Sequence, residues 1–222
     1  MGALGGKKVL VVGRGSGIAR AVALGARHAG AEVLVAGRDP GALRGAYEGE
    51  SGIAAEAVDV VDEASIAALA VRLGHLDHVV TTASARARGG VGDLTPETVA
   101  LSFATKAIGP ILLAKHLAPI MPSDGSFVLS SGATAIRPAP GMQAVAGTNG
   151  GVDAIAPGTI DSGAYDALGE EGKAALFYRR SENNPAGRIG SSEDVAQAVL
   201  FALTADFLTG VSIPVDGGEI LV

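Results

Sequence analysis

The 222-residue sequence has no cysteine, which excludes disulfide bonds, thiolate catalysis and cysteine-bound metal. Its four histidines show no metal-ligand spacing, and only His75 and His78 lie close together. A pair of this kind is more often an ordinary surface feature. We therefore expect no metal site.

Aromatic residues make up only 4% of the chain, so alanine, valine, leucine and isoleucine must form the core. With 33 glycines, this composition suits helices packed closely on a parallel sheet. The net charge of −6 argues against a nucleic-acid partner. We expect no membrane span, because no stretch reaches the required length, and the N-terminus lacks a signal-peptide layout. A single cytoplasmic domain over residues 1–222 is the simplest expectation.

Short apolar runs alternate with helical patterns over the first 132 residues. Strands are predicted at 7–13, 31–39, 52–59, 76–84 and 125–132. Helices are predicted at 18–30, 62–74 and 95–121, with a weaker one at 40–50. This alternation predicts an α/β fold, a single doubly wound domain with a parallel sheet flanked by helices.

The alternation fails after Gly132. A strand is predicted at 152–157, but only two or three turns of weak helix, at 141–151, precede it. A crossover between parallel strands needs at least about 10–12 residues and usually contains a helix. We therefore predict a shortened crossover before the sixth strand. An irregular segment at 159–188, taken as the substrate lid, precedes a helix at 191–204 and a last strand at 210–218.

Three glycines, Gly13, Gly15 and Gly17, lie between the first strand and the first helix. Glycines there let the backbone approach a pyrophosphate, and the helix N-terminus supplies N–H donors. The pattern G-x-G-x-x-G is not met; the chain has Gly13-x-x-x-Gly17-x-Ala19 instead. A tight turn without a ligand would also need glycine, but the position in an alternating chain favours a dinucleotide site.

Arg14 and Arg38 indicate which dinucleotide binds. Arg14 lies inside the glycine loop, and Arg38 follows the second strand, where an acidic residue would bond a ribose 2′-hydroxyl. A 2′-phosphate requires arginine there instead, and Gly37 leaves space for it. Asp39 is the contrary feature, although it begins a turn that we expect to face away. The charges favour NADP(H).

Several motifs together resemble the short-chain dehydrogenase/reductase family: Gly13-x-x-x-Gly17-x-Ala19, Asp59-Val60, TTAS after the fourth strand, PGTIDS and the terminal VDGG. The resemblance covers nearly the whole chain. It implies a Rossmann fold, a nicotinamide cofactor, hydride transfer on a small carbonyl or alcohol, and a homo-oligomer. Its implied cofactor contacts are Gly13, Arg14, Gly15, Ser16, Gly17 and Ile18 for the pyrophosphate, Asp59 and Val60 for the adenine, Thr82, Ala83 and Ser84 in the Asn-Ala-Gly position, and Pro157, Gly158, Ile160 and Ser162 beside the nicotinamide.

The catalytic Tyr-x-x-x-Lys motif of that family is absent. Four residues after the three tyrosines stand Ser51, Gly169 and Glu182. By position, the tyrosine falls at Val145 and the lysine at Asn149. The family's helix asparagine falls at Lys106, and its serine at Ser131 or Gly132. The crossover that follows Asn149 is also about twenty residues shorter than usual.

Three interpretations remain open. The first is an NADP(H)-dependent reductase whose proton comes from Lys106 or Ser131, with Tyr165 a less favoured donor; Lys106 could equally be an ordinary surface lysine. The second is an NADP(H)-binding protein without turnover, acting as a sensor or an oligomer partner. The third is that the crossover has lost residues from the sequence, which would not restore the tyrosine because Val145 precedes the gap. The last strand is apolar enough for an interface, and the short crossover predicts a weaker dimer.

Overall fold

The computed structural model describes residues 2–136, 141–151, 155–206, 208 and 210–222. Within them, a five-stranded sheet has the order β3-β2-β1-β4-β5, and every neighbouring pair is parallel. Its strands are β1 (Lys8–Val12), β2 (Glu32–Gly37), β3 (Ile53–Ala57), β4 (His78–Thr81) and β5 (Ser126–Leu129). The predicted α/β fold with a parallel sheet is confirmed.

Two shorter pairs of strands continue this architecture. The N–H of Ser131 donates to the carbonyl oxygen of Ile155 at 2.7 Å, and a parallel bridge joins Ser130 to Ile155. The bridge places β6 (Ile155–Pro157) beside the end of β5, and β6 pairs in parallel with β9 (Ile213–Val215). A separate parallel pair is formed by β7 (Ile160–Asp161) and β8 (Gly190–Ser191).

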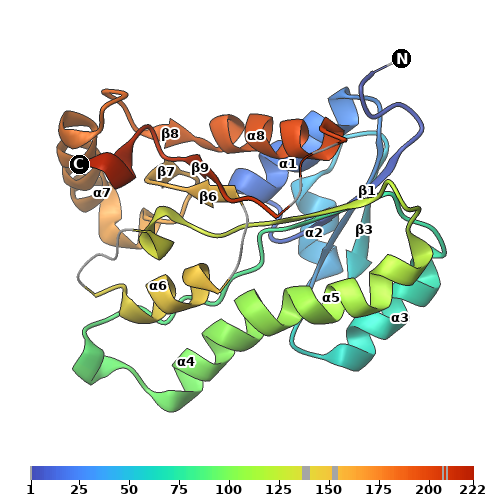
Figure 1. Cartoon of the computed structure of the whole chain (residues 1–222), viewed down its shortest axis with the longest axis horizontal. Coiled ribbons are helices and arrows are strands. Elements are labelled where there is room, and N and C mark those ends of the chain that lie inside the picture. The colour runs from blue at the N-terminus through green and yellow to red at the C-terminus, as the bar shows by residue number, and fades with distance from the viewer. Residues whose placement is uncertain (1, 137–140, 152–154, 207, 209) are drawn as a thin grey trace.

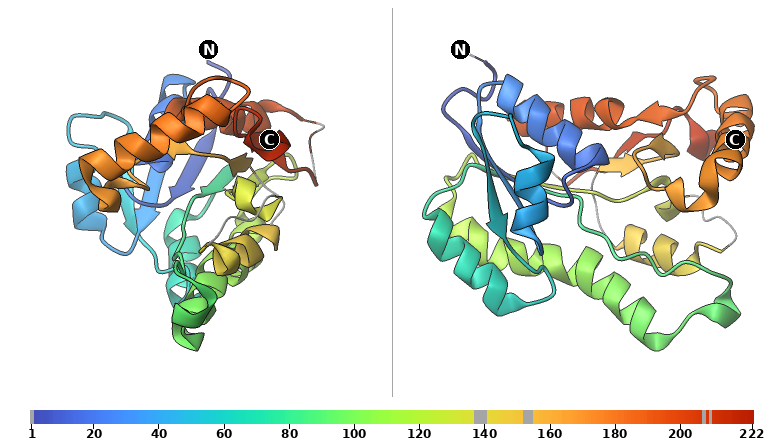
Figure 2. Two further views of the ribbon diagram at one scale, coloured as in Figure 1. Left: turned by 90° about the vertical axis from the view of Figure 1, so that its left-hand side faces the viewer. Right: turned by 180° about the vertical axis from the view of Figure 1, so that it is seen from behind.

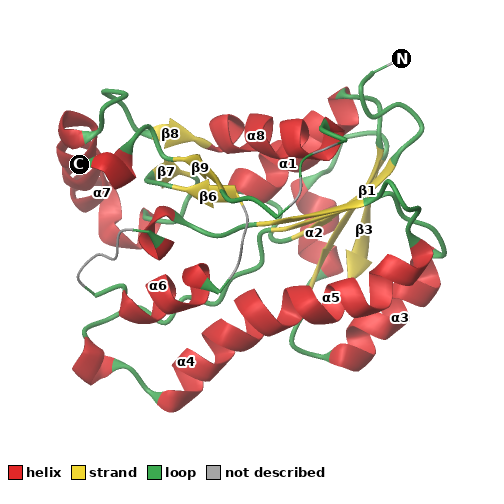
Figure 3. Ribbon diagram, in the orientation of Figure 1, coloured by secondary structure: helices red, strands yellow, loops and turns green. Residues whose placement is uncertain are grey.

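Helices cover both faces of the sheet (Figures 1 and 2). They are α1 (Gly17–His28), α2 (Pro40–Ala46), α3 (Glu63–Leu73), α4 (Pro96–Phe103), α5 (Gly109–Leu117), α6 (Gln143–Gly150), α7 (Gly169–Asn183) and α8 (Ser192–Thr204). Shorter turns are η1 (Val91–Asp93), η2 (Ala104–Ile108), η3 (Ala118–Ile120), η4 (Ala133–Ala135), η5 (Asp166–Leu168) and η6 (Glu219–Leu221). Figure 3 shows the strands enclosed between the two helical layers.

The side chains of β1 alternate between two hydrophobic cores. Val9 and Val11 pack in the core shared with α1, α2 and α8, whereas Leu10 and Val12 pack in the core shared with α3 and α5. Successive side chains of a strand point to opposite faces, so a strand buried on both faces is apolar throughout. This explains why 7–13 reads as a continuous apolar run.

The helix ends follow the sequence closely. Thr95 caps α4 with Pro96 in its first turn, and Ser191 and Asp194 form a capping box at α8. The predicted helix at 95–121 is continuous, but η2 within it is a π-helical turn that contains Lys106. Such turns are rare and occur frequently at functional sites.

The prediction of an irregular segment at 159–188 is wrong in part, because α7 occupies fifteen of these residues. No side chain of α7 is buried. A helix without a buried apolar stripe lacks the periodicity by which helices are recognised in sequence. Figure 1 shows α7 at one end of the molecule, beside the C-terminus.

The crossover between β5 and β6 contains a short helix. It runs from Leu129 to Ile155, and the one α-helix among its described residues is α6, with eight residues. This agrees with the expected weak helix. Asp153, the one titratable side chain of the stretch 142–158, lies outside the described residues.

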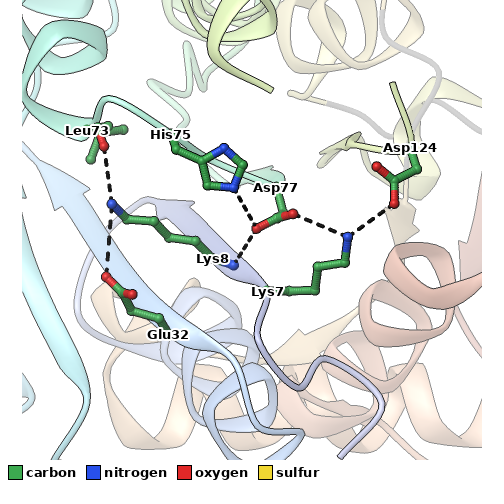
Figure 4. A network of polar contacts seen from close by, with 7 residues as sticks. All are labelled: Lys7, Lys8, Glu32, Leu73, His75, Asp77 and Asp124. Carbon is green, nitrogen blue, oxygen red and sulfur yellow. Dashed lines mark hydrogen bonds and ion pairs between the residues drawn. The ribbon is translucent and has the colours of Figure 1, made fainter. Parts of the chain in front are cut away.

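A polar network ties the amino ends of three strands together (Figure 4). The Lys7 ammonium contacts Asp77 at 3.2 Å and Asp124 at 3.1 Å, and the backbone N–H of Lys8 donates to Asp77 at 2.8 Å. His75 lies 3.3 Å from the same carboxylate. Burial alone would raise the pKa of Asp77, but the Lys8 N–H and the Lys7 ammonium outweigh it, and the pKa is lowered. The network lies at the sheet edge opposite the carboxyl ends and holds β1, β4 and β5 in place.

In the described part of the chain, one helix has the length and composition to cross a membrane. It is the continuous helix Pro96–Ile120, in whose most apolar window 33% is buried. The expectation that no stretch reaches this length is therefore wrong. Helices of soluble α/β proteins can meet the same criterion, because one face packs on a sheet. Leu113 and Leu117 of this helix do so, with at most 1% of their surface exposed.

Candidate functional site

A cleft of about 1440 Å³ lies at the carboxyl ends of the parallel strands. Open α/β sheets bind ligands at this edge. With one exception, every residue predicted from the sequence to form the site lines this cleft: Gly13, Arg14, Gly15, Ser16, Ile18, Arg38, Asp59, Val60, Thr82, Ala83, Ser84, Lys106, Ser131, Pro157, Gly158, Ile160 and Ser162. The exception is Gly17, the first residue of α1, which lies in a smaller neighbouring hollow.

The glycine loop is closely packed, and its backbone requires glycine. A Cβ atom on Gly13 would collide with the Thr82 hydroxyl, and Gly17 has a φ of +57°, in the left-handed region. Ser16 precedes α1 with extended backbone, and its side chain makes no capping hydrogen bond. No acidic residue lies in the first turn. A helix N-terminus of this kind can receive an anion, so the loop fits a pyrophosphate.

The end of the cleft beside β2 carries an exposed arginine. Arg38 lines it, and the neighbouring Asp39 accepts a hydrogen bond from the Ala42 N–H at 2.9 Å, which caps α2. The carboxylate of Asp59 accepts from the Val61 N–H at 3.1 Å. Both carboxylates are therefore engaged by the backbone close to their own positions.

Lys106 is buried at the sheet edge, with 8% of its surface exposed. The interpretation of an ordinary surface lysine is therefore wrong. Its ammonium donates to the backbone oxygen of Ser131 at 3.3 Å. Burial, together with the charge of Arg86, lowers the pKa of Lys106 to about 8. A lysine with this pKa is still largely protonated at neutral pH and is a stronger acid than a lysine in water.

The hydroxyl of Ser131 is held by the backbone. It donates to the carbonyl oxygen of Asn149 at 2.8 Å, and both residues are buried. A hydrogen bond of this kind places Ser131 in a structural position at the strand end, while its own carbonyl oxygen receives Lys106.

Gly132 and Asn149 lie against each other. A Cβ atom on Gly132 would stand 2.7 Å from the amide nitrogen of Asn149, which donates to the Thr134 hydroxyl at 2.7 Å. The amide oxygen of Asn149 is buried and has no hydrogen-bond partner among the described residues. Val145, one turn earlier in α6, is also buried and lines the cleft. Neither Val145 nor Asn149 can supply a proton.

Tyr165 reaches the cleft from the segment 159–188 and is packed by its neighbours. Its ring meets that of Phe177 edge to face at 5.8 Å, and the guanidinium of Arg88 lies 6.0 Å from its centroid. These contacts give Tyr165 a packing position within the segment predicted as a lid.

Arg86 and Arg88 also line the cleft, although they were not predicted from the sequence as site residues. They follow β4 directly after the stretch 82–84, where two arginines separated by one residue are the signal that could have revealed them. Burial and the neighbouring charge of Arg88 lower the pKa of Arg86. Arg179 and Arg180 of α7 face the cleft from the other side.

Residues 12–154 and 146–219 match a protein-family model described as Enoyl-(Acyl carrier protein) reductase. The match covers most of the chain in two segments. They overlap at residues 146–154, in the last part of the crossover between β5 and β6.

Proteins of similar sequence are named as dehydrogenases and reductases. The chain is 28% identical to 2-keto-3-deoxy-L-fuconate dehydrogenase of Xanthomonas campestris pv. campestris, over 242 residues covering 97% of this chain and 80% of that protein. It is 31% identical to the inactive 2-(S)-hydroxypropyl-CoM dehydrogenase 2 of Xanthobacter autotrophicus, covering 89% of this chain and 98% of that protein. The first alignment exceeds the 222 residues of the chain, so that relative contains residues without a counterpart here.

A solved structure of a small-chain dehydrogenase in complex with NADPH has the same fold. Its sequence is 26% identical, the TM-score is 0.80, and the alignment covers 97% of this chain and 99% of that one.

Proposed function

The chain belongs to the short-chain dehydrogenase/reductase family, and from that premise we propose that it is an NADP(H)-dependent oxidoreductase acting on a small carbonyl or alcohol. We propose further that it is an atypical member, in which Lys106 replaces the usual tyrosine as proton donor. The observation that carries this proposal is a buried lysine with a pKa of about 8 in the same cleft as the glycine loop.

The choice of NADP(H) is supported by two arginines. Arg14 and Arg38 line the cleft, and we propose that Arg38, with Arg14, binds the 2′-phosphate. Asp39 would oppose a phosphate, but its carboxylate caps α2. Arg14 also donates to the Ser162 backbone oxygen at 3.0 Å, which joins the glycine loop to the segment after β7. The NADPH complex of the structural relative agrees with this choice.

The proton that the carbonyl oxygen receives must come from a residue of this chain. A bound nicotinamide would supply the hydride that adds to the carbonyl carbon. The carbonyl oxygen then gains negative charge, and a donor about 2.6–3.2 Å away must meet it. Lys106 transfers one ammonium proton to that oxygen, becomes a neutral amine, and regains the proton from water. The backbone oxygen of Ser131 positions Lys106, because it accepts a 3.3 Å hydrogen bond from the ammonium.

Val145 and Asn149, at the usual tyrosine and lysine positions, have different roles in this proposal. We propose that Val145 shapes the pocket as an apolar wall, and that the unpartnered amide oxygen of Asn149 receives a ligand hydroxyl. Gly132 leaves room for the Asn149 amide. The three changes fit one another, which supports a reorganised site over a site that has merely lost its tyrosine.

Two observations favour a second function. The hydroxyl of Ser131 is engaged by the backbone, and the relative from Xanthobacter autotrophicus is named as inactive. On this alternative, the chain binds NADP(H) without turnover and acts as a sensor or an oligomer partner. The buried, acidified Lys106 favours the enzyme, because a binding protein gains nothing from holding a lysine charge in a buried position.

We propose that residues 159–188 form the lid and that the chain assembles into a homo-oligomer in the cytoplasm. Leu101, Phe103, Ile108 and Ile111 expose between 39% and 68% of their surface along α4 and α5. An apolar surface of this kind is more typical of an interface than of a free face. A second copy on this face would explain why the helix is apolar on both sides.

Titration with NADPH and NADH, followed by turnover against a panel of small carbonyl compounds, tests the proposed function. We expect NADPH to bind more tightly and to be consumed with at least one carbonyl. Binding without consumption across a broad panel would favour the non-catalytic alternative.

A further inference from the structure

The loop that follows β4 places two arginines in the cleft. Arg86 and Arg88 both line the cleft, whose walls partly enclose Arg86 although its side chain stays accessible to solvent. Arg88 is fixed, because it donates to the Ala164 backbone oxygen at 3.2 Å and lies over the ring of Tyr165. Arg86 makes no hydrogen bond to any described residue, so its guanidinium keeps all its donors for a ligand.

Lys106 stands close enough to feel this charge. The positive charge of Arg86 contributes to the lowered pKa of Lys106, and Arg88 and Arg14 act on Arg86 in the same way. Arg86 and Lys106 line the same cleft, and Lys106 donates to the backbone oxygen of Ser131 just after β5.

Among the described residues, Arg86, Arg88 and Lys106 form no ion pair. Three carboxylate side chains of the described part of the chain line the cleft. Asp39 and Asp59 accept backbone N–H groups at the end beside β2 and β3, and Glu219 pairs with Arg180 at 3.0 Å.

Positive charge gathered in a concave site with no counter-ion attracts an anion and raises its local concentration. A planar guanidinium with free donors matches a carboxylate with two parallel hydrogen bonds. We propose that the substrate carries a carboxylate that Arg86 binds, with its reacting carbonyl directed toward Lys106. The inference rests on the proposed function for the carbonyl, but the anion-binding site stands on the arrangement of charges alone.

A phosphate of the cofactor is the other anion that Arg86 could contact. The two sources differ in what an Arg86 variant weakens. Loss of a substrate contact weakens the oxo acid and leaves NADPH binding unchanged, whereas loss of a cofactor contact weakens NADPH itself.

The test is a binding experiment on the NADPH-saturated protein. Isothermal titration calorimetry compares 2-oxobutanoate and 2-oxooctanoate with their methyl esters, on the wild type, Arg86→Met and Arg86→Lys. Arg44→Met is the matched control, because Arg44 lies on α2 outside the cleft. Thermal unfolding of each variant checks that it is folded, and NADPH affinity is measured separately.

We expect at least one acid to bind about ten- to a hundredfold more tightly than its ester, as a charge-assisted hydrogen bond provides. Arg86→Met should abolish the difference, Arg86→Lys should retain part of it, and Arg44→Met should retain all of it. Equal binding of acids and esters, no binding of either, or weakened NADPH affinity in Arg86→Met would overturn the proposal. Discrimination in binding without turnover would uphold the anion site while contradicting the proposed enzyme.

Discussion

Replacing Lys106 by methionine separates catalysis from folding more cleanly than any other change in this cleft. Methionine keeps an unbranched apolar side chain of similar length and removes the ammonium. A positioned general acid contributes about a hundred- to ten-thousandfold to rate. We expect turnover to fall by that factor, with NADPH affinity unchanged, because the glycine loop and Arg38 remain intact.

The stability of this variant can be worked from the lowered pKa. A shift from 10.5 to about 8 corresponds to a cost of about 3 kcal/mol for holding Lys106 charged in the fold. Methionine removes this cost, and it also removes the hydrogen bond to Ser131, worth about 1 kcal/mol. Lys106→Met should therefore be at least as stable as the wild type at pH 7.

The pH dependence adds a signature specific to this residue. Above pH 8 native Lys106 loses its proton while the unfolded chain keeps it up to about 10.5, so wild-type stability rises with pH across this window. Reductase activity should fall over the same range, because the acid is lost. Lys106→Met should show neither effect.

The assay follows NADPH absorbance under saturating carbonyl from pH 6 to about 10, a range chosen to span both pKa values. Lys115→Met is the control, since Lys115 is exposed on α5 and pairs with Glu63 outside the cleft. If Lys106→Met keeps the activity and pH profile of the wild type, the proton comes from Ser131, Tyr165 or water, and the mechanism is wrong.

Four further outcomes are expected. NADPH should bind about ten- to a hundredfold more tightly than NADH, and Arg38→Ala should narrow this difference in a fluorescence titration; equal wild-type affinities would refute the assignment. Asp77→Asn should lower the free energy of unfolding in urea by about 1–3 kcal/mol at pH 7. The pKa of Asp77 is lowered in the fold, so the ionised carboxylate loses its contribution to stability as the pH falls below 3.8. A stability difference between the wild type and Asp77→Asn that persists below this pH would contradict this reason. Gly132→Ala should destabilise by about 1–3 kcal/mol, and a double-mutant cycle with Asn149→Ala should show coupling; additive effects would exclude the contact. Light scattering at micromolar concentration should show an oligomer that Ile111→Glu weakens, and a monomeric wild type would refute the assembly.

Most of the fold could be predicted from the sequence, because each local pattern agrees with the global one. The apolar run of β1, the capping residues Thr95 and Ser191, and the glycine loop each specify their own element. α7 could not be recognised, since none of its side chains is buried and its pattern has no apolar stripe.

The sequence predicts the candidate site only where the position of a residue along the chain determines its place in the fold. The carboxyl ends of parallel strands meet at one edge, so the residues that follow the strands line one cleft. The burial of Lys106 depends on a π-helical turn, and the contact of Gly132 with Asn149 joins two elements across the crossover. Arg86 points into the cleft through the path of a loop. The first two have no local pattern, and the third has only the pair of arginines separated by one residue after β4.

The central claim is that this cleft binds NADP(H) and transfers hydride although Tyr-x-x-x-Lys is absent. Its most direct test is the consumption of NADPH by the wild-type chain in the presence of a panel of small carbonyl compounds, with binding of NADPH measured in the same samples. The account predicts saturable binding and the formation of an alcohol in an amount equal to the NADP+ produced. Saturable binding with no alcohol from any compound, or no binding of NADPH at all, would contradict it.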